Sequence, residues 1–190
     1  MNQRWLPERI AYDGSQLRAH WILGETGLVG DAVVGFRGSC RVADAEMADL
    51  EDLLARSEIA ADDMVHCLIE VFDDGDIMRA VFLQRLVSAL ALDTLRELSA
   101  GAEIRRSGDD LFVGEGKLSI SVATRSLVST LIHFAVNVSN AGTPVRTASL
   151  EDIGVESEVF AKAFLGAIVE EYQSVRDARA QVRAKGEARR

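Results

Sequence analysis

The side chains of this sequence that could carry out chemistry gather in its second half. Asp109 and Asp110 stand next to each other beside a turn, where paired carboxylates can bind a metal ion or act as a general base. Lys117 opens a predicted strand after the turn at residues 114–116, where it is placed to contact a ligand. The alternative for all three residues is a plain role as solvated turn side chains.

Two predicted strands, 117–123 and 131–139, favour a pocket beside these residues. In each strand, apolar side chains alternate with small or polar ones, which gives the strand two different faces. Small Ser and Ala side chains beside single Lys, His and Asn groups leave room for a ligand, although an open solvent surface is the alternative. We therefore predict helices on the apolar faces and a pocket on the other faces. The apolar faces carry Leu118, Ile120 and Val122 on the first strand and Ile132, Phe134, Val136 and Val138 on the second, and the pocket faces carry Lys117, Ser119, Ser121 and Ala123 and then Leu131, His133, Ala135 and Asn137.

The other histidines and cysteines give weaker signals. His133 lies in an otherwise apolar strand, as either a core histidine or a site residue. His66 and Glu70 share a strand face, but their Cα atoms are about 13 Å apart, too far to chelate one metal ion. No zinc-ligand spacing occurs in the sequence. Cys67 is predicted to lie in the core, and Cys40 in a loop, where a reactive thiolate is the alternative to an inert thiol.

The elements that must position these residues predict an α+β fold. A strand at 64–72 precedes the strongest helix, 77–99, whose apolar residues recur at helical spacing. A hairpin, the strand at 131–139 and a second long helix at 156–185 follow. Short hairpin connections predict a mainly antiparallel sheet with two long helices packed on one face. Nearer the N-terminus we predict a strand that ends at residues 20–23, a buried strand at 31–36, and a weak helix or ordered loop at 44–56.

Length and composition limit the class of protein. The chain has 190 residues, 48% of them hydrophobic, which fits one compact domain and excludes a disordered chain. We predict one domain over residues 1–175, followed by a basic helix end or tail at 176–190. No apolar run reaches the roughly 20 residues needed to span a bilayer, and the first residues do not resemble a signal peptide. With two cysteines and no disulfide framework, a cytoplasmic protein is expected.

The net charge of −9 is unevenly distributed. Residues 44–76 contain twelve acids and one base, a net charge of −11, whereas residues 176–190 contain six bases and two acids, a net charge of +4. The acidic stretch disfavours nucleic-acid binding, because like charges repel phosphates. The basic end is interpreted as a solvated helix end, with contact to RNA or to an acidic partner as the alternative. We expect this charge to have little to do with the pocket, whose strands are nearly neutral.

Several of these motifs resemble those of known families. The run Arg106–Ser119 is similar to the segment of biotin and lipoate protein ligases that contains Asn-Asp-Leu, a turn and a lysine. The strand Ile132–Asn137 is similar to a later strand of those ligases. Over most of its length the chain resembles more closely domain-of-unknown-function family 366. The pieces that carry this second resemblance are Tyr12–Ser15, Phe36–Gly38, Met47–Asp52, Arg105–Phe112, Lys117–Ser119 and Leu131–His133.

The resemblance to the ligases implies a biotin/lipoate-ligase-like fold and a set of catalytic roles. Lys117 would hold a carboxylate or phosphoryl oxygen, at the place where negative charge gathers. Asp109 and Asp110 would lie where the ligases bind nucleotide and metal, and Asn137 would line the floor of the pocket.

The sequence also departs from the ligase pattern. Arg37 and Gly38 match only a remnant of the basic adenylate loop, and an acidic segment follows them. His133 and Ala135 replace two glycines of the ligases' biotin strand. Use of ATP and Mg²⁺ is therefore implied by resemblance alone.

We accordingly predict a cytoplasmic protein with a small-molecule pocket, for acyl or adenylyl transfer in the manner of biotin and lipoate ligases. The alternative is a non-catalytic module on the same scaffold that binds a ligand or another protein. The sequence leaves a homodimer open and identifies no metal site. The predicted catalytic residues are Lys117, Asp109 and Asp110, and the predicted ligand-binding residues are Arg37, Gly38, Ser119, Ser121, His133 and Asn137.

Overall fold

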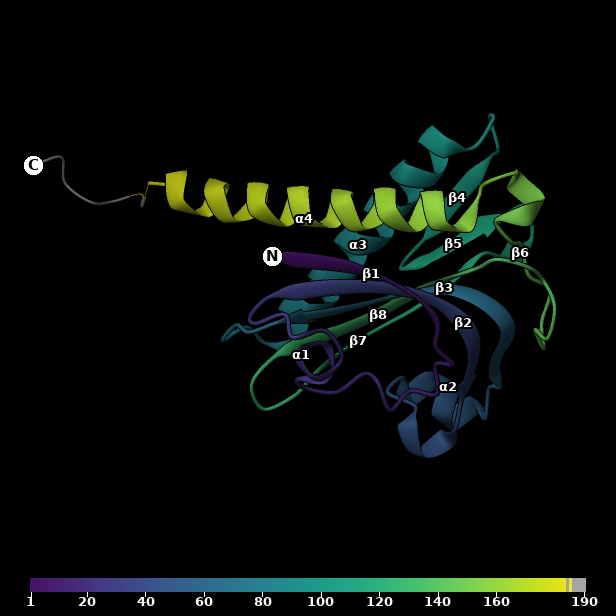
Figure 1. The fold of residues 1–190 in the computed structure, drawn as a ribbon, viewed down its shortest axis with the longest axis horizontal. Coiled ribbons are helices and arrows are strands. Elements are labelled where there is room, and N and C mark those ends of the chain that lie inside the picture. Colours follow the sequence, from purple (N-terminus) through teal and green to yellow (C-terminus); the bar gives the residue numbers. More distant parts are fainter. Residues whose placement is uncertain (184, 186–190) are drawn as a thin grey trace, which may run out of the picture.

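The computed structural model describes residues 1–183 and 185, and its elements form two layers (Figure 1). A five-stranded sheet forms one layer, and the helices α3 (Ile77–Leu98) and α4 (Ser157–Gln181) form the other. The short helices α1 (Trp21–Thr26) and α2 (Leu50–Ala55) lie on the opposite side of the sheet. The remaining elements are β1 (Asn2–Arg9), β2 (Ala32–Val42), η1 (Asp44–Glu46), β3 (Ile59–Val71), β4 (Ile104–Ser107), β5 (Asp110–Val113), β6 (Gly116–Lys117), β7 (Ser119–Arg125), β8 (Thr130–Asn137) and η2 (Glu151–Ile153).

The large sheet is mainly antiparallel, as predicted. Its strands are ordered β1-β2-β3-β8-β7, and β1 and β2 form its parallel pair. The strands β4, β5 and β6 form a second, three-stranded antiparallel sheet. Both long helices pack on one face of the large sheet, with α4 over β1, β2 and β3 and α3 over β7 and β8. The predicted α+β class is therefore confirmed.

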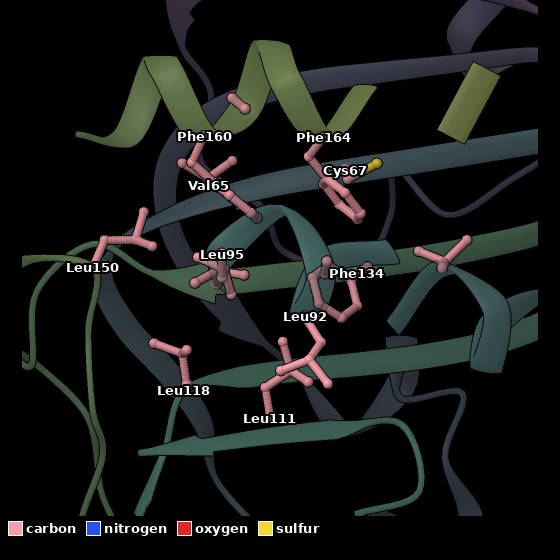
Figure 2. Close-up of a cluster of buried hydrophobic side chains, with 14 of the residues drawn as sticks. Val65, Cys67, Leu92, Leu95, Leu111, Leu118, Phe134, Leu150, Phe160 and Phe164 are labelled. Carbon is pink, nitrogen blue, oxygen red and sulfur yellow. The ribbon is translucent and has the colours of Figure 1, made fainter. Parts of the chain in front are cut away.

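The main core lies between the helices and the large sheet. Val65 and Cys67 of β3 and Phe134 of β8 contribute to the same buried cluster as Leu95 of α3 and Phe164 of α4 (Figure 2). Val65 and Cys67 are two positions apart and Phe134 lies opposite Cys67, so the three residues share one face. Full burial of a Leu or Phe side chain contributes about 1.5–3 kcal/mol relative to its exposure, which makes this layer a main source of stability. Cys67 is a core residue, as predicted.

A second buried cluster covers part of the opposite face of the sheet. Phe36 of β2 and Met64 and Leu68 of β3 pack there against Tyr12 and Trp21 from the N-terminal segment. The two faces of β3 therefore have different partners. The face turned away from the long helices is the one that carries His66 and, on β8, His133.

Several predicted elements are present with shifted ends. The helix predicted at 77–99 is α3, and the weak helix expected within 44–56 is α2, with η1 before it. The strand predicted at 31–36 extends to residue 42, and the strand predicted at 64–72 begins at residue 59. Ladder bonds between β2 and β3 account for both extensions, because they continue from Ala32–Glu70 to Val42–Ile59.

The prediction of a strand ending at residues 20–23 is wrong, because these residues begin α1. The strand of this region is β1, at residues 2–9. The carboxylate of Glu70 accepts the His20 N–H at 3.0 and 3.1 Å and fixes the start of the helix, and Gly27, with a φ of 72°, ends it. This contact joins residues 50 positions apart in the chain, so local sequence does not reveal it.

The prediction for the strand 117–123 is wrong in its faces. Lys117 ends β6 in the small sheet, and β7 starts at Ser119 in the large one. Ser121 lies opposite Phe134, which places it on the helix side, whereas Val122 lies opposite His133 on the other side. The chain crosses between the sheets at Leu118, which is itself buried in the helix-side core, so the alternation shifts by one residue.

The predicted basic end at 176–190 is described only in part, because residues 184 and 186–190 lie outside the described residues. Within the described part, Arg176 pairs with Asp31 at 3.2 Å. None of the described helices has a stretch long and apolar enough to cross a membrane.

Candidate functional site

A cavity of about 310 Å³ lies against the face of β3 and β8 that is turned away from the long helices. Its volume is at the lower end of the range for small-molecule sites, about 300–1,000 Å³. Segments distant in sequence form its walls: residues 12–17, the end of β2, residues 46–64, the strands β6, β7 and β8, and the loop at 143–147. The apolar lining includes Leu17, Val42, Met47, Ala60, Ala61, Met64, Ile120, Val122, Pro144 and Val145, and the uncharged polar lining includes Tyr12, Cys40, Ser57, Ser121, His133, Asn137, Thr143 and Thr147.

The structure brings four of the residues predicted from sequence to this cavity. Lys117, Ser121, His133 and Asn137 line it. Asp110 does not line it but pairs with Lys117. The other predicted residues, Arg37, Gly38, Asp109 and Ser119, are outside its lining.

Lys117 and Asp110 form an ion pair at the wall of the cavity. Lys117 Nζ lies 2.9 Å from Asp110 Oδ2, and both side chains are partly exposed. Burial raises the pKa of the Asp110 carboxyl, although the Lys117 ammonium opposes this shift. Within the described part of the chain, Lys117 is the only lysine or arginine that lines the cavity. It is therefore the single cation available there to an anionic ligand.

Asp109 points to helix α3 and does not form a joint site with Asp110. Its carboxylate accepts a hydrogen bond from Gln84 Nε2 at 2.7 Å and pairs with Arg85 at 3.2 Å. Each of the two aspartates thus has its own cationic partner. Among the residues that the structure describes, no group of three His, Cys, Asp or Glu side chains could hold a metal ion. These two carboxylates do not fit a Mg²⁺–nucleotide site of the kind that the ligase resemblance implies.

Arg37 and Gly38 serve the packing of the sheet. The Arg37 guanidinium binds the Asp63 carboxylate at 2.6 Å and donates to Ser157 Oγ at 3.0 Å, so it ties β2 and β3 to the start of α4. Asp63, in turn, raises the pKa of Arg37. Gly38 has no room for a side chain, because a Cβ there would overlap the carbonyl oxygen of Ile10. Neither residue lines the cavity, whereas the residues of a phosphate-binding loop would do so.

The two serines predicted for the pocket floor bind protein groups. Ser119 Oγ accepts the Leu111 N–H at 2.9 Å, and Ser121 Oγ accepts a bond from Gln84 Nε2 at 3.1 Å. Both bonds lie on the helix side, in agreement with the shifted faces of β7. Ser121 borders the cavity while its hydroxyl is engaged elsewhere.

Asn137 holds the cavity wall together. Its Nδ2 donates to the carbonyl oxygens of Lys117 and Ala148, each at 3.1 Å. These bonds fix the junction of β6 and β7 to β8 and to the segment that follows the 143–147 loop. Both amide protons are used, which leaves Oδ1 as the group of this side chain that can still accept a bond.

A pair of buried histidines lies at the base of the site. His66 Nδ1 is 3.0 Å from His133 Nε2, and His66 Nε2 is 3.3 Å from the carbonyl oxygen of Gly38. The ring of Tyr12 stacks on His133, with centroids 3.8 Å apart. Burial lowers the pKa of His66 to about 4 and lowers the pKa of His133 well below its ordinary value. Both imidazoles are therefore neutral near pH 7.

Sequence reasoning missed two members of this cluster. The sequence offers His66 only as a metal ligand with Glu70, and Tyr12 only as part of a family motif. The available signal was the shared face of the two strands, since His66 and His133 are both at positions that alternate with core residues. What the sequence does not contain is the register, which places His66 opposite Ala135 and Leu68 opposite His133.

Cys40 lies in β2, where it lines the cavity, and not in a loop as predicted. Burial raises the pKa of its thiol to about 12, so the side chain is a neutral, weakly polar wall of the cavity. A reactive thiolate, the alternative considered from sequence, is not favoured in this environment.

The acidic stretch contributes to the cavity, which corrects the expectation that its charge is remote from the pocket. Glu46, Asp49, Asp52 and Glu58 are all lining residues. Asp49 caps α2 and Glu58 pairs with Arg41 at 3.5 Å, whereas Glu46 and Asp52 have no ion-pair partner among the described residues. The site therefore combines one lysine with several carboxylates, a balance that disfavours a polyphosphate.

Comparison with solved structures relates the whole fold to two groups of proteins. A protein of unknown function from Pyrococcus horikoshi has a TM-score of 0.91 and 42% identity, over 96% of this chain and 99% of that one. The biotin protein ligase from Aquifex aeolicus, in complex with biotin and ATP, has a TM-score of 0.61 and 12% identity, over 93% of this chain and 72% of the ligase. Protein Ta0514 from T. acidophilum, a proposed lipoate protein ligase solved with lipoic acid, has a TM-score of 0.58 and 15% identity, over 91% and 87% of the two chains. The biotin/lipoate-ligase-like fold is thereby confirmed.

Sequence comparison gives the family. The uncharacterized protein MJ0805 from Methanocaldococcus jannaschii is 29% identical over 157 residues, which are 80% of this chain and 70% of that protein. The family model described as a domain of unknown function, DUF366, matches residues 1–183. The chain therefore belongs to the DUF366 family and carries a biotin/lipoate-ligase-like fold.

Proposed function

We propose that this protein binds a small organic acid in the cavity, with the carboxylate of the ligand at Lys117. The observation that carries the proposal is the position of Lys117, the one lysine or arginine among the described lining residues, at the edge of a largely apolar floor. An ammonium group has three N–H donors, and the ion pair with Asp110 uses one of them. The other donors are available to a ligand carboxylate. A charge-assisted bond of this kind is about twice as strong as a neutral one.

The floor favours a ligand with an apolar body. Met64, Ile120 and Val122 line it together with the ring of Tyr12. Burial of apolar ligand surface against such side chains contributes about 25 cal/mol per Å², so an aliphatic or aromatic chain supplies affinity while the carboxylate supplies orientation. The two ligands named for the similar folds, biotin and lipoic acid, are both carboxylic acids with an aliphatic chain. This likeness supports the ligand class and does not select a compound.

Acyl or adenylyl transfer is the second candidate function, favoured by the similarity to the Aquifex enzyme solved with biotin and ATP. It would use the same pocket, with Lys117 next to the acyl group. A triphosphate, however, needs several cations, and the lining supplies one lysine with four acids. Arg37, which the ligase resemblance offers to the phosphates, is held by Asp63 and Ser157. Binding without nucleotide turnover is therefore the function that the site supports best.

Calorimetric titration with octanoate, lipoate, biotin and 3-phenylpropionate tests the proposal, with the corresponding primary amides as uncharged controls. We expect at least one acid to bind, and Lys117→Met to weaken that binding by at least about tenfold, since a charge-assisted bond is worth about 1.5–3 kcal/mol. Lys162→Met is the matched control, because Lys162 is an exposed helix lysine paired with Glu158. Failure of every acid to bind, or equal binding by Lys117→Met, contradicts the proposal.

A pyrophosphate-release assay with ATP, Mg²⁺ and each acid separates the two candidate functions. Release that depends on the acid and is lost in Lys117→Met supports transfer. Acid binding without release supports the binding function alone.

A further inference from the structure

We propose that His133 presents a fixed hydrogen-bond acceptor at the cavity, and that the ligand is therefore a molecule with an N–H or O–H donor at the end that contacts His133. This inference rests on the proposed function, which has the cavity bind a small organic molecule. It adds the chemistry of a second contact point, distinct from Lys117.

The carbonyl oxygen of Gly38 is the fixed end of the network. A carbonyl oxygen can only accept, so His66 Nε2, at 3.3 Å from it, carries a proton. The other nitrogen of a neutral imidazole then has a lone pair, and His66 Nδ1 accepts from its neighbour. That neighbour is His133 Nε2, at 3.0 Å, which must donate. His133 Nδ1 is left with a lone pair and no proton.

The surroundings keep both imidazole rings neutral, and the order of donors and acceptors from Gly38 to His133 requires neutral rings. His66 is fully buried and His133 is 3% exposed. Phe36 stacks on His66 with centroids 5.0 Å apart, and Tyr12 covers both imidazoles. An imidazolium in this stack would be desolvated and would face another histidine, and no carboxylate contacts either ring among the described hydrogen bonds and ion pairs. The acceptor at His133 Nδ1 is thus a stable feature of the site.

This acceptor has no partner in the described part of the protein. His133 forms its one described hydrogen bond through Nε2, and the residue lines the cavity. An acceptor without a protein partner can still bond to a ligand, so a ligand donor at this atom gains a hydrogen bond that a ligand acceptor cannot form. The cavity then has two poles, with a donor at Lys117 and an acceptor at His133. It selects molecules that are complementary at both.

Histidine-labelled protein tests the proton positions without any ligand. Two-bond nitrogen–proton NMR spectra distinguish the two neutral tautomers and the imidazolium. The chain has three histidines, and the variant His20→Asn removes the signal of the exposed one, at a left-handed backbone position that Asn tolerates. We expect His66 and His133 both to carry the proton on Nε2 at pH 7. A proton on His133 Nδ1, or an imidazolium signal from either residue, overturns the inference whether or not any organic acid binds.

The fragments indole and benzofuran test the consequence for ligands, because they have the same shape and differ by one N–H. We expect indole to bind about two- to tenfold more tightly, as expected for one neutral hydrogen bond, and to shift the His133 Nδ1 resonance. In His66→Phe, which removes the acceptor for His133 Nε2–H, the proton of His133 redistributes between its nitrogens and the preference for indole falls. Equal binding of the two fragments, or an unshifted His133 resonance with indole bound, overturns the inference. Binding of octanoate that depends on Lys117, without a preference for indole, leaves the proposed function intact and rejects only the donor requirement.

Discussion

Tyr12 stacks on His133 with ring centroids 3.8 Å apart and ring planes inclined by 13°. The two residues come from different parts of the molecule: Tyr12 lies in the N-terminal segment, next to Cys40 of β2 through an isolated strand bridge, and His133 lies in the centre of β8. Their contact fastens the N-terminal segment to the sheet and forms one wall of the cavity. The packing of the N-terminal segment and the geometry of the cavity therefore both depend on the Tyr12 ring.

The first prediction concerns this ring. Tyr12→Ala is expected to lower the free energy of unfolding by about 3–5 kcal/mol, because it empties the space beside two buried histidines. Tyr12→Phe keeps the stack, and the Tyr12 hydroxyl has no hydrogen bond among the described contacts, so a loss within about 1 kcal/mol is expected. Urea denaturation measures both. Tyr172→Phe is a useful comparison, because it removes a tyrosine hydroxyl that donates to Asp31 at 2.7 Å. An equally large loss of stability in Tyr12→Phe and Tyr12→Ala would contradict the prediction.

The second prediction is a loss of stability between pH 6.5 and about pH 4. Burial depresses the pKa of His66 from 6.5 to about 4, so in this range the unfolded chain binds a proton that the native protein does not. The free energy of unfolding therefore rises as the pH increases from about 4 to 6.5. Above pH 6.5 the contribution of His66 is complete and reaches up to about 3 kcal/mol. Burial depresses the pKa of His133 as well, which acts in the same direction.

The variant His66→Gln isolates this effect. Gln has no proton to gain, so the difference in unfolding free energy between this variant and the wild type should grow as the pH rises from 4 to 6.5. His20→Asn is the comparison variant, because it removes an exposed histidine that takes no part in the pair of His66 and His133. The carboxyl groups with shifted pKa values, which are lowered in Asp63 and Asp73 and raised in Asp110, are present in both proteins, so their contributions cancel in the difference. A difference that does not change with pH would show that His66 titrates alike in both states.

The elements that were predicted well are those whose signal is local. The helix α3 has apolar residues at helical spacing. Val65, Cys67, Phe134 and Val136 lie on wholly apolar strand faces that alternate with mixed ones, so their face was evident from sequence. The same alternation placed His133 and Asn137 on the pocket side. Lys117 was found because it follows a turn that is visible as glycines. None of these required knowledge of distant contacts.

The elements that were predicted poorly depend on contacts between distant residues. The two faces of β7 were predicted the wrong way round, because the chain passes from one sheet to the other at Leu118 and the pattern of apolar residues does not indicate this change. The partnership of His66 with His133 depends on the register of β3 and β8, and the presence of Asp52 at the cavity depends on how residues 44–58 fold back. The resemblance to the ligases' basic loop offers Arg37 as a binding residue, but its partners, Asp63 and Ser157, are 26 and 120 positions away. Sequence alone cannot supply these pairings.

The third prediction separates packing from ligand binding at Gly38. Gly38→Ala should prevent folding or lower the free energy of unfolding by at least about 3 kcal/mol, because its Cβ would overlap the Ile10 carbonyl between adjacent chain segments. Gly24→Ala is the matched control: Gly24 lies within α1, and a Cβ there meets nothing within 4 Å, so stability should be unchanged or raised by about 0.5–1 kcal/mol. Thermal unfolding monitored by circular dichroism compares the two. A folded and stable Gly38→Ala protein would return Gly38 to consideration as a ligand contact.

The fourth prediction concerns the acid that pairs with Lys117. Asp110→Asn should change stability by less than about 1 kcal/mol, because the pair is partly exposed. It should strengthen octanoate binding by about two- to fivefold, since the competing carboxylate is removed from the Lys117 ammonium. Asp109→Asn, which affects Arg85 and Gln84 outside the cavity lining, should leave octanoate binding unchanged. If Asp110→Asn instead abolishes octanoate binding, Asp110 takes a direct part in the site, and the ion pair with Lys117 is not simply a competitor of the ligand.

The fifth prediction assigns a role to the acids of the cavity wall. Asp52 lines the cavity without an ion-pair partner among the described residues, and its charge contributes to the raised pKa of Asp110, so its field extends to the Lys117 site. Asp52→Asn should therefore tighten octanoate binding about two- to threefold at low salt and weaken octylamine binding, because the two probes have opposite charges on the same chain.

Both effects should fade as salt is added, since the screening length falls from about 10 Å at 0.1 M to about 3 Å at 1 M. Asp44→Asn is the matched control, because Asp44 belongs to the same acidic stretch but does not line the cavity. Calorimetric titration of the two probes against wild type and the two variants gives all the required values. If Asp52→Asn changes the affinities for octanoate and octylamine in the same direction, Asp52 acts through the shape of the cavity. If Asp44→Asn and Asp52→Asn have equal effects, the acidic stretch acts as a distant field and not as part of the site.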